Sequence, residues 1–588
     1  MAAADETDLV NYLRSLYSEA RNERRNLYDT WYRNYRLVHN RQANTTAQAW
    51  MPAPKDSEVY PTVSTLVAWM ADQNTSVTAI PASDPHGPTS QFMNQLSRDL
   101  STVLTTNWHV LDYRSQIKLA LWDAFTYGIG IFKTVWDQGL DFGLGNAMLR
   151  RCDPWAVYVD PNGTSFADAE YVVEARRMSF SEVERRWPET YHKISDLGGD
   201  GTTQIDAGPR SMSLSNTLPT PGNLRSSGTI GNLGSSNAMT RWSVPTSSSQ
   251  RHLSRTDTIV VYEFWLKENE SYSEEIEGTD YAERRVGESW RVVVMAGGEV
   301  LMDERASDLF THGTHPYDRY VFDDVGEFYG VALVDHLASP QIYINRLLTA
   351  LQHSAELTGN PVMLEPTNSG LARVGIVNRP GTRLKVNQQS MQTPPTWMTP
   401  PTMSNDVPKL IDFWISRVDN ISGQSAMKNV NLSRTAEGVN ASVQEAAFVR
   451  IRSGLANLEA SLESAASKLA DLIVDNYTEP RFMAIVGPNG QQSMLALDAR
   501  HFNAPNEDGA TPLKYTIKIE AGSAAPTSRT SRMAEADMAF ALGAIDRQAW
   551  LEAHNYPNWP EINERINKLQ AMGLFQPPGA RQRAQRRT

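Results

Sequence analysis

With 588 residues, the chain is long enough for more than one hydrophobic core, and its formal net charge of −12 argues against a surface that coats nucleic acid. Its single cysteine, Cys152, excludes an intramolecular disulfide framework and fits a reducing compartment. The N-terminus shows no basic, apolar leader, and no uninterrupted apolar run of about 18 residues occurs, so we expect neither a classical secretion signal nor a membrane span.

The first predicted element is an amphipathic helix over residues 8–38. Its apolar side carries Leu9, Leu13, Leu16, Ala20, Leu27 and Trp31. Its other side carries Arg21, Arg24, Arg25 and Arg33. These arginines suit phosphate contact, but we favour the simpler interpretation of a solvated helix face.

The next part of the chain mixes helix and strand patterns. Residues 91–127 have helical spacing, and residues 128–137, 149–161 and 170–179 are typical of strands. A short helix with a serine cap follows and ends before Pro188. This order predicts an α+β domain.

Residues 197–256 are rich in Gly, Ser, Thr, Asn and Pro, and we interpret them as a mobile insertion. Strands are predicted again at 258–267 and 289–303. The segment between them is acidic, with Glu268, Glu270, Glu274, Glu275, Glu277 and Asp280. An ion site is conceivable, but the spacing matches no calcium loop, and a solvated hairpin tip is the favoured interpretation.

A helical region is predicted from residue 329, with Ser339 and Pro340 as an N-cap and first-position pair and with Gly359 at the end. Its apolar face carries Ile344, Leu347, Leu348, Leu351 and Ala355. Residues 361–404 then form an extended excursion with a basic balance, which comes from Arg373, Arg379, Arg383 and Lys385.

The chain is organised around residues 405–477, which predict a short helix, a polar loop and a very long helix. The short helix carries Val407, Ile411, Trp414, Val418 and Ile421 on one face and ends at Gly423. The long helix, over 435–476, carries Phe448, Ile451, Leu455, Leu458, Leu462, Ala465, Leu469 and Leu472. At about 60 Å it exceeds a small domain, so we expect neighbouring subunits to cover part of it.

Two strand patterns follow, at 481–487 and 513–522, and then a helical tail over 529–572 and a basic end with Arg581, Arg583, Arg586 and Arg587. The sequence contains no GxxxxGK[ST], HExxH, GxSxG or CxxC motif. His312 and His315 are interpreted as turn residues and not as metal ligands.

Several stretches, in this order, resemble the portal proteins of tailed double-stranded DNA bacteriophages. They are YGIGIFKTVWD, RCDPWAVYVDP, HPYDRYVFDDVGEFYGVALVDHLASPQIYINRLLTAL, GNPVMLEP and the long run from TAEGVNASV to RFMAIVG. The resemblance implies an α+β, mainly helical chain with wing, stem, clip and crown regions, assembled into a dodecameric ring around a DNA channel.

The resemblance also implies a division of the chain into regions. Residues 1–328 would be the wing, 329–360 the first stem helix, 361–404 the clip, 405–422 the second stem helix, 423–436 the tunnel loop, 437–476 the long wing-to-crown helix, 477–528 a β-containing wing segment and 529–588 the crown helices with the basic tail. The insertion at 197–256 matches no element of the family.

Three groups of site residues follow from this division. The tunnel loop would present Met427, Lys428, Asn429, Asn431 and Arg434 to DNA. The clip would meet the terminase or the adaptor through Arg373, Arg379, Arg383 and Lys385. Contacts between subunits would involve Leu347, Leu351, Trp414, Val418, Ile451, Leu455, Leu458 and Leu462.

The expected function is a non-enzymatic portal at one capsid vertex, through which genomic DNA is packaged and ejected. Its expected partners are copies of itself, double-stranded DNA, the large terminase subunit, head–tail adaptor or tail proteins, and the major capsid and scaffolding proteins. It would act in the virion, and in the host cytoplasm during assembly, without cofactor or metal. Two alternatives remain, namely another phage head–tail structural protein and a hydrolase that uses the acidic segment near Glu274.

Overall fold

The computed structural model describes residues 2–41, 54–71, 75–81, 90–195, 258–275, 282–310, 313–359, 363–364, 396–397, 406–424, 437–477, 481–486, 492–497, 515–521, 529–545 and a few positions from 550 to 568. The chain forms two compact units. The first comprises Met1–Asp72, Tyr113–Val135 and Met148–Lys468, and the second comprises Gln73–Asp112, Trp136–Ala147 and Leu469–Thr588. Each unit contains helices and sheets, in agreement with the predicted α+β class.

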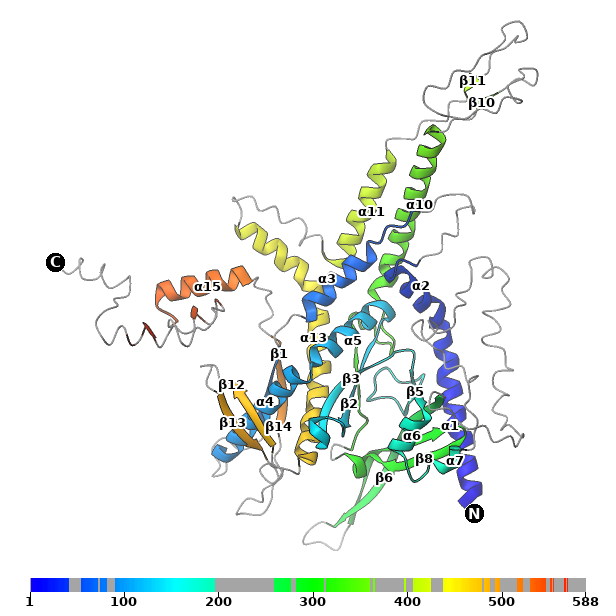
Figure 1. The fold of residues 1–588 in the computed structure, drawn as a ribbon, viewed down its shortest axis with the longest axis vertical. Coiled ribbons are helices and arrows are strands. Elements are labelled where there is room, and N and C mark those ends of the chain that lie inside the picture. Colours follow the sequence, from blue (N-terminus) through cyan, green and yellow to red (C-terminus); the bar gives the residue numbers. More distant parts are fainter. Residues whose placement is uncertain are drawn as a thin grey trace, which may run out of the picture. The chain divides into compact units, whose positions relative to one another are not determined.

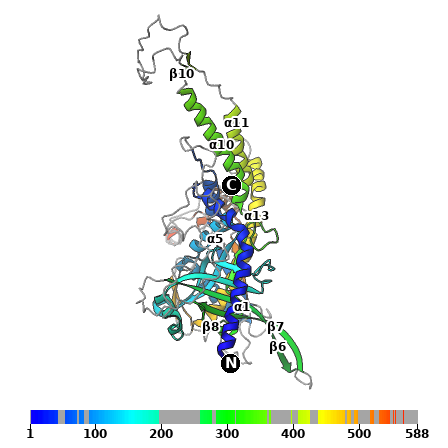
Figure 2. The same cartoon turned by 90° about the vertical axis from the view of Figure 1, so that its right-hand side faces the viewer.

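The first unit contains an antiparallel five-stranded sheet with the order β4-β5-β6-β7-β8. Its strands are β4 (Val157–Val159), β5 (Tyr171–Ser179), β6 (Thr258–Glu275), β7 (Ala282–Ala296) and β8 (Glu299–Arg305). β6 and β7 stay paired beyond the neighbouring strands and form a long hairpin, which is visible in both views (Figure 1, Figure 2).

The alternation of side chains gives this sheet two apolar faces. One face, with residues such as Tyr262 and Phe264, packs against Leu13 and Leu16 of α1 (Ala2–Arg24). The other face, with residues such as Trp265, joins a core that includes residues of a three-stranded sheet. The sheet is therefore the middle layer of this unit.

The three-stranded sheet has the order β3-β2-β9. β2 (Gly130–Asp137) pairs antiparallel with β9 (Tyr317–Tyr320), and β3 is Asn146–Cys152. Ile131 of β2 and Tyr317 of β9 are fully buried in the shared core. The three strands predicted from 128–179 are therefore confirmed, with the stretch at 149–161 divided into β3 and β4.

The N-terminal helix is confirmed but interrupted, and one of its arginines is not solvated. A 3-10 turn, η1 (Arg25–Leu27), separates α1 from α2 (Tyr28–Val38). The interpretation of Arg24 as a solvated residue was wrong, because this residue is only 1% exposed. It donates to the carbonyl oxygens of Trp155 at 2.8 Å and Val157 at 2.6 Å, and so anchors the helix to the start of β4 and to the loop before it.

The predicted start of the helix at 339–340 was also wrong. α10 runs through Leu333–Gly359 and contains Pro340 in its interior. Proline there removes one helical hydrogen bond, a loss that continuous helix on both sides tolerates. Asp335 caps the earlier start, because its carboxylate accepts from the backbone N–H of Ala332 at 3.2 Å. α11 (Asp406–Ser422) lies beside α10 in both views (Figure 1, Figure 2) and ends, as predicted, at Gly423, whose φ is 75°.

The long helix is confirmed as α13 (Glu437–Asn476). Within the first unit it lies along β9 and the residues that follow this strand. The side-chain amide of Asn457 donates to the carbonyl oxygen of Val321 at 3.2 Å, and Lys468 donates to Asp318 at 2.9 Å. Gly454 lies against the ring of Phe322. The chain itself therefore covers this stretch of the helix.

The second unit is built from segments that are far apart in the sequence. β1 (Thr75–Pro81) pairs antiparallel with β14 (Tyr515–Ala521), β12 (Arg481–Val486) pairs with β13 (Gln492–Leu497), and α4 (Ser90–Val110) packs on β1. A buried polar cluster joins α4, the first residue of β3 and the residue that follows α13. Asn107 of α4 donates to the Tyr477 hydroxyl at 3.1 Å, and this hydroxyl donates to Asn146 at 3.0 Å.

Other predicted boundaries need correction. The helical stretch at 91–127 consists of α4 and α5 (Tyr113–Tyr127), which are separated where Asp112 has a φ of 51°. The tail helix α15 is Arg529–Leu542 and ends at Gly543, where φ is 72°, because the left-handed backbone there ends the helix. The acidic residues from Glu268 to Glu275 belong to β6 and not to a loop.

The remaining elements are short or lie in segments for which the sequence made no prediction. They are α3 (Val59–Ala71), η2 (Asp141–Gly143), α6 (Phe180–Arg186), α7 (His192–Ser195), α9 (Ala306–Leu309), β10 (Met363–Leu364) and β11 (Thr396–Trp397). The serine cap predicted for the short helix is Ser179, whose side chain accepts from the backbone N–H of Glu182. The insertion at 197–256 and the basic end of the chain lie outside the described residues.

The contact between α13 and Phe322 yields a test. A Cβ at Gly454 would lie 2.3 Å from the Phe322 ring, so Gly454→Ala should lower the free energy of unfolding by about 1–3 kcal/mol through overpacking. Ser453→Ala, at the exposed neighbouring position, is the matched control and should be neutral or slightly stabilising. Chemical denaturation measures both, and equal stabilities for the two variants would contradict this helix packing.

Candidate assembly and channel elements

Two of the three predicted groups of site residues fall where the structure makes no statement. The tunnel-loop residues Met427, Lys428, Asn429, Asn431 and Arg434 lie outside the described residues, as do the clip residues Arg373, Arg379, Arg383 and Lys385. The structure describes the helices that precede and follow each of these two segments.

The beginning of the predicted tunnel loop is anchored to α3. After α11 the side chain of Gln424 is buried, and its amide donates to the carbonyl oxygen of Thr62 in α3 at 2.7 Å. The chain is described again at Glu437, where α13 begins. The segment 425–436 thus joins an anchored helix end to the start of the long helix.

The predicted clip is flanked in the chain by α10 and α11, which form a helical hairpin. Tyr343 of α10 stacks on Trp414 of α11, with ring centroids 5.1 Å apart and an angle of 11° between the rings. Ile344 and Val418 are fully buried. In the chain segment that connects the two helices, β10 (residues 363–364) pairs with β11 (residues 396–397).

This hairpin also exposes large apolar side chains. Phe413 is 58% exposed and Leu410 is 46% exposed on α11, while Tyr343 is 43% and Ile342 is 37% exposed on α10. Leaving such groups in water costs free energy, and clusters of them mark surfaces that bind other molecules. The hairpin is therefore a candidate assembly surface.

The predicted inter-subunit residues divide into two sets. Leu347, Leu351 and Trp414 are partly exposed in the single chain and can still meet a neighbour. Val418 and the long-helix residues Ile451, Leu455, Leu458 and Leu462 are already buried within the chain. The role of both sets between subunits stays a prediction.

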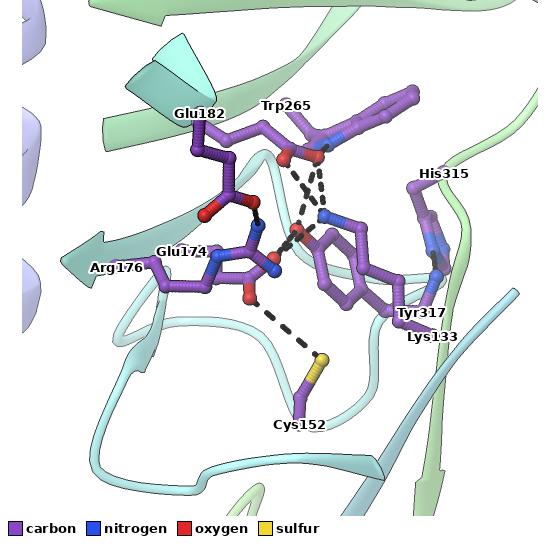
Figure 3. A network of polar contacts seen from close by, with 9 residues as sticks. Lys133, Cys152, Glu174, Arg176, Glu182, Trp265, His315 and Tyr317 are labelled. Carbon is purple, nitrogen blue, oxygen red and sulfur yellow. Dashed lines mark hydrogen bonds and ion pairs between the residues drawn. The ribbon is translucent and has the colours of Figure 1, made fainter. Parts of the chain in front are cut away.

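A buried ionic cluster, which the sequence reading missed, holds the two sheets of the first unit together (Figure 3). The ammonium group of Lys133 on β2 lies 2.6 Å from a Glu174 oxygen and 2.7 Å from a Glu263 oxygen. Glu174 on β5 and Glu263 on β6 are directly opposed in the strand register. The Tyr317 hydroxyl donates to Glu174 at 2.9 Å, and the Trp265 indole donates to Glu263 at 2.7 Å.

The ionisation of this cluster follows from its contacts. Burial alone raises the pKa of the Glu174 carboxyl, but the charge of Lys133 and its hydrogen bond outweigh burial and lower that pKa. Burial lowers the pKa of Lys133, and the two carboxylates more than compensate and raise it. Burial, followed by the charge of Glu174, raises the pKa of the Cys152 thiol. The contacts therefore favour a charged Glu174 and Lys133 and a neutral Cys152 thiol.

The sequence carried a signal for this cluster. Lys133, Glu174 and Glu263 are each a single charged residue within an apolar strand pattern, in IFKTV, YVVEA and VYEFW. A charge at an inward position of a buried strand requires a partner. The sequence does not tell which charges meet, because this depends on how the sheets pack.

The described part of the chain contains neither a metal-binding cluster nor a helix that could span a membrane. No group of three or more His, Cys, Asp or Glu side chains there has an arrangement that fits a metal ion. His315 is buried beside Trp290 and accepts from the backbone N–H of Tyr317, whereas His312 lies outside the described residues. None of the described helices is long and apolar enough to cross a bilayer.

Long paired helices with uncovered apolar side chains, such as α10 and α11, are typical of a protein that builds an assembly. A family model of phage P22-like portal proteins matches residues 15–587, so the chain belongs to that family. The comparison with curated proteins found no match.

Membership of this family establishes the general function of the chain. The chain is a phage portal protein, a virion component of capsid assembly and genome packaging. Proteins of this family are structural and not enzymatic, and the family implies an oligomeric ring and the passage of DNA. The alternatives of another head–tail protein and of a hydrolase near Glu274 thereby lose their support.

The buried cluster predicts a pH-dependent stability. In Lys133→Met, two opposed carboxylates lose their cation, so the free energy of unfolding at pH 7 should fall by about 3–5 kcal/mol. Because the pKa of Glu174 is lowered in the folded protein, its stabilising contribution is complete above the ordinary value of 4.5 and is lost as the pH falls from there through the lowered pKa, so the deficit should shrink below pH 4.5.

Denaturant unfolding of both proteins between about pH 2.5 and 7 measures this difference. Lys118→Met, at an exposed position of α5, is the matched control and should show little loss at any pH. A deficit for Lys133→Met that is constant over this range would contradict the ionised cluster.

Proposed function

We propose that the chain closes into a ring of about twelve copies whose central channel conducts double-stranded DNA. The observation that carries this proposal is the exposed apolar surface of the α10–α11 hairpin. Phe413, Leu410 and Tyr343 are each more than 40% exposed although the two helices already pack on one another. Burying one such side chain against a neighbour contributes about 1.5–3 kcal/mol, and a closed ring repeats this gain in each subunit.

We assign the regions of the chain to this ring as follows. α10 and α11 are the stem helices, and the basic excursion 361–404 between them is the clip. The segment 425–436 belongs to the tunnel loop, and α13 leads from the wing towards the crown. This assignment is supported by the continuous 40-residue length of α13 and by the anchoring of Gln424 on α3 where the loop begins.

In the tunnel loop, Lys428 and Arg434 would contact phosphate oxygens of DNA. Such contacts do not read the base sequence and weaken with added salt, which suits a channel through which DNA slides. The basic clip residues would bind the terminase during packaging and the adaptor afterwards. Because the family is structural, a separate ATPase would supply the energy for packaging.

The ring proposal is tested by native mass spectrometry with negative-stain imaging. The unmodified chain should give rings with a central hole, and Phe413→Asp should reduce the yield of rings at least tenfold, since a charge is placed in an apolar contact. Asn11→Asp, which adds the same charge at an exposed polar position of α1, should assemble normally. Normal rings from Phe413→Asp would refute the stem contact.

The tunnel-loop role has a separate test. Lys428→Ala with Arg434→Ala should leave ring size and yield unchanged but should impair packaging or retention of DNA, because two phosphate contacts per subunit are lost. Virion yield and packaged DNA per particle measure the effect. Replacing two basic residues outside the loop, Arg581 and Arg583, by alanine gives a control of equal charge. Full DNA retention in the loop variant would exclude this role.

A further inference from the structure

The connection between β2 and β3 lies within Trp136–Ala147 of the second unit and ends in an apolar tip. We call residues 138–145 the tip. Phe142 is fully exposed, and Leu144 is 48% exposed. A two-strand connection ordinarily carries polar turn residues, and folding does not require a phenylalanine whose ring contacts only solvent. The tip therefore contains an apolar group that the single chain does not use.

The backbone of the tip is strained. Asp141, Phe142 and Gly143 are consecutive residues with φ angles of 50°, 58° and 96°. Glycine and aspartate tolerate this left-handed region, but a bulky aromatic residue rarely adopts it. Strain of this kind persists only where the surrounding structure determines it, and it clusters at functional positions.

The base of the tip is fixed by several contacts. The side-chain amide of Asn146 donates to the Asp141 carboxylate at 2.7 Å. Asn146 is itself held in the buried cluster with Asn107 and Tyr477. Gly145 lies so close to Trp136 that a Cβ there would be 2.6 Å from the indole nitrogen. These contacts hold Phe142 in one exposed position before any partner arrives.

The same chain presents a surface of complementary chemistry on α3 and α5 of the first unit. Tyr60, 52% exposed, stacks on Trp122 with ring centroids 5.6 Å apart, and Leu119 is 39% exposed beside them on α5. Lys118, one turn before Trp122, is exposed and positively charged. The tip carries apolar side chains next to Asp141, and this surface carries apolar side chains next to a lysine.

We propose that the tip of one subunit docks on the α3–α5 surface of an adjacent copy in the ring. This inference rests on the ring assembly proposed above. Closed rings use heterologous contacts, in which one surface of each subunit meets a different surface of the next. Two complementary surfaces on one chain meet this requirement, and the preorganised tip loses little conformational entropy on docking.

The position of the contact is tested by photocrosslinking. Phe142 is replaced by p-benzoylphenylalanine, and rings are assembled from a mixture of ¹⁴N-labelled and ¹⁵N-labelled subunits. After irradiation, mixed-isotope crosslinks should join position 142 to peptides from α3 or α5. The same replacement at Val110, which is 71% exposed in the second unit, is the matched control and should give no mixed-isotope crosslink to α3 or α5.

The outcomes separate this inference from the ring proposal. If the unmodified chain forms no rings, the proposed function fails and the inference fails with it. If intact rings give no mixed-isotope crosslink from position 142, or crosslinks outside α3 and α5, only the docking proposal is overturned.

A second test uses the strain. Phe142→Gly removes an exposed ring and relieves the left-handed backbone, so the dissociated subunit should unfold at a higher denaturant concentration. The concentration needed for half-maximal ring formation should nevertheless rise about tenfold, which corresponds to about 1.4 kcal/mol per contact. Val325→Gly, at an exposed apolar position outside the tip and outside α3 and α5, should not raise this concentration. Unchanged assembly of Phe142→Gly would overturn the proposal.

Discussion

The packing of the first unit depends on the placement of one ammonium group between two carboxylates. Glu174 and Glu263 lie opposite each other on neighbouring strands, and like charges in this position repel. Lys133, from the other sheet, bridges both of them. The bridge fixes the register in which the two sheets meet, because a shift of β2 by one residue would turn Lys133 away from both carboxylates. The apolar core between the sheets is then assembled around a single ionic arrangement.

The second consequence of this packing concerns the long helix. β9, which pairs with β2, also supplies Asp318 and the backbone groups that bind α13. The helix is therefore attached to the same rigid element as the ionic cluster. Its residues from 437 to 468 belong to the first unit and its last residues to the second. The sheet and the helix that follows the predicted tunnel loop are therefore held together by the same strand.

Much of the fold was predictable from periodicity. The helices from 8 to 38 and from 437 to 476 and the strands at 130–137, 171–179 and 258–267 have strong patterns that local structure follows. α3, β1 and β13 were missed. The burial of Arg24 was also missed, because its carbonyl partners lie about 130 residues further along the chain. Pro340 misled the prediction, because a local start signal was outweighed by the helix on both sides.

The candidate site was less accessible to sequence reasoning than the fold. The family could be inferred from the order of its segments, whereas the roles of Lys428, Arg434 and the clip residues depend on contacts with DNA and with other chains. Phe142 is an example of a feature that the structure shows and the sequence does not predict. Nothing in the letters DFG separates an exposed, strained phenylalanine from a buried one, since the difference lies in the backbone angles and in the contacts of Asn146.

The pairing of β1 with β14 has a consequence for biosynthesis. Roughly 430 residues separate the two strands in the chain, so the ribosome completes β1 long before its partner exists. At about 5–20 residues per second, the edge of β1 waits for about 20–90 s during translation. An unpaired strand edge invites association with other chains, so nascent subunits synthesised on one polysome run this risk together. Slower translation or a shortage of chaperones should therefore affect the second unit before the first.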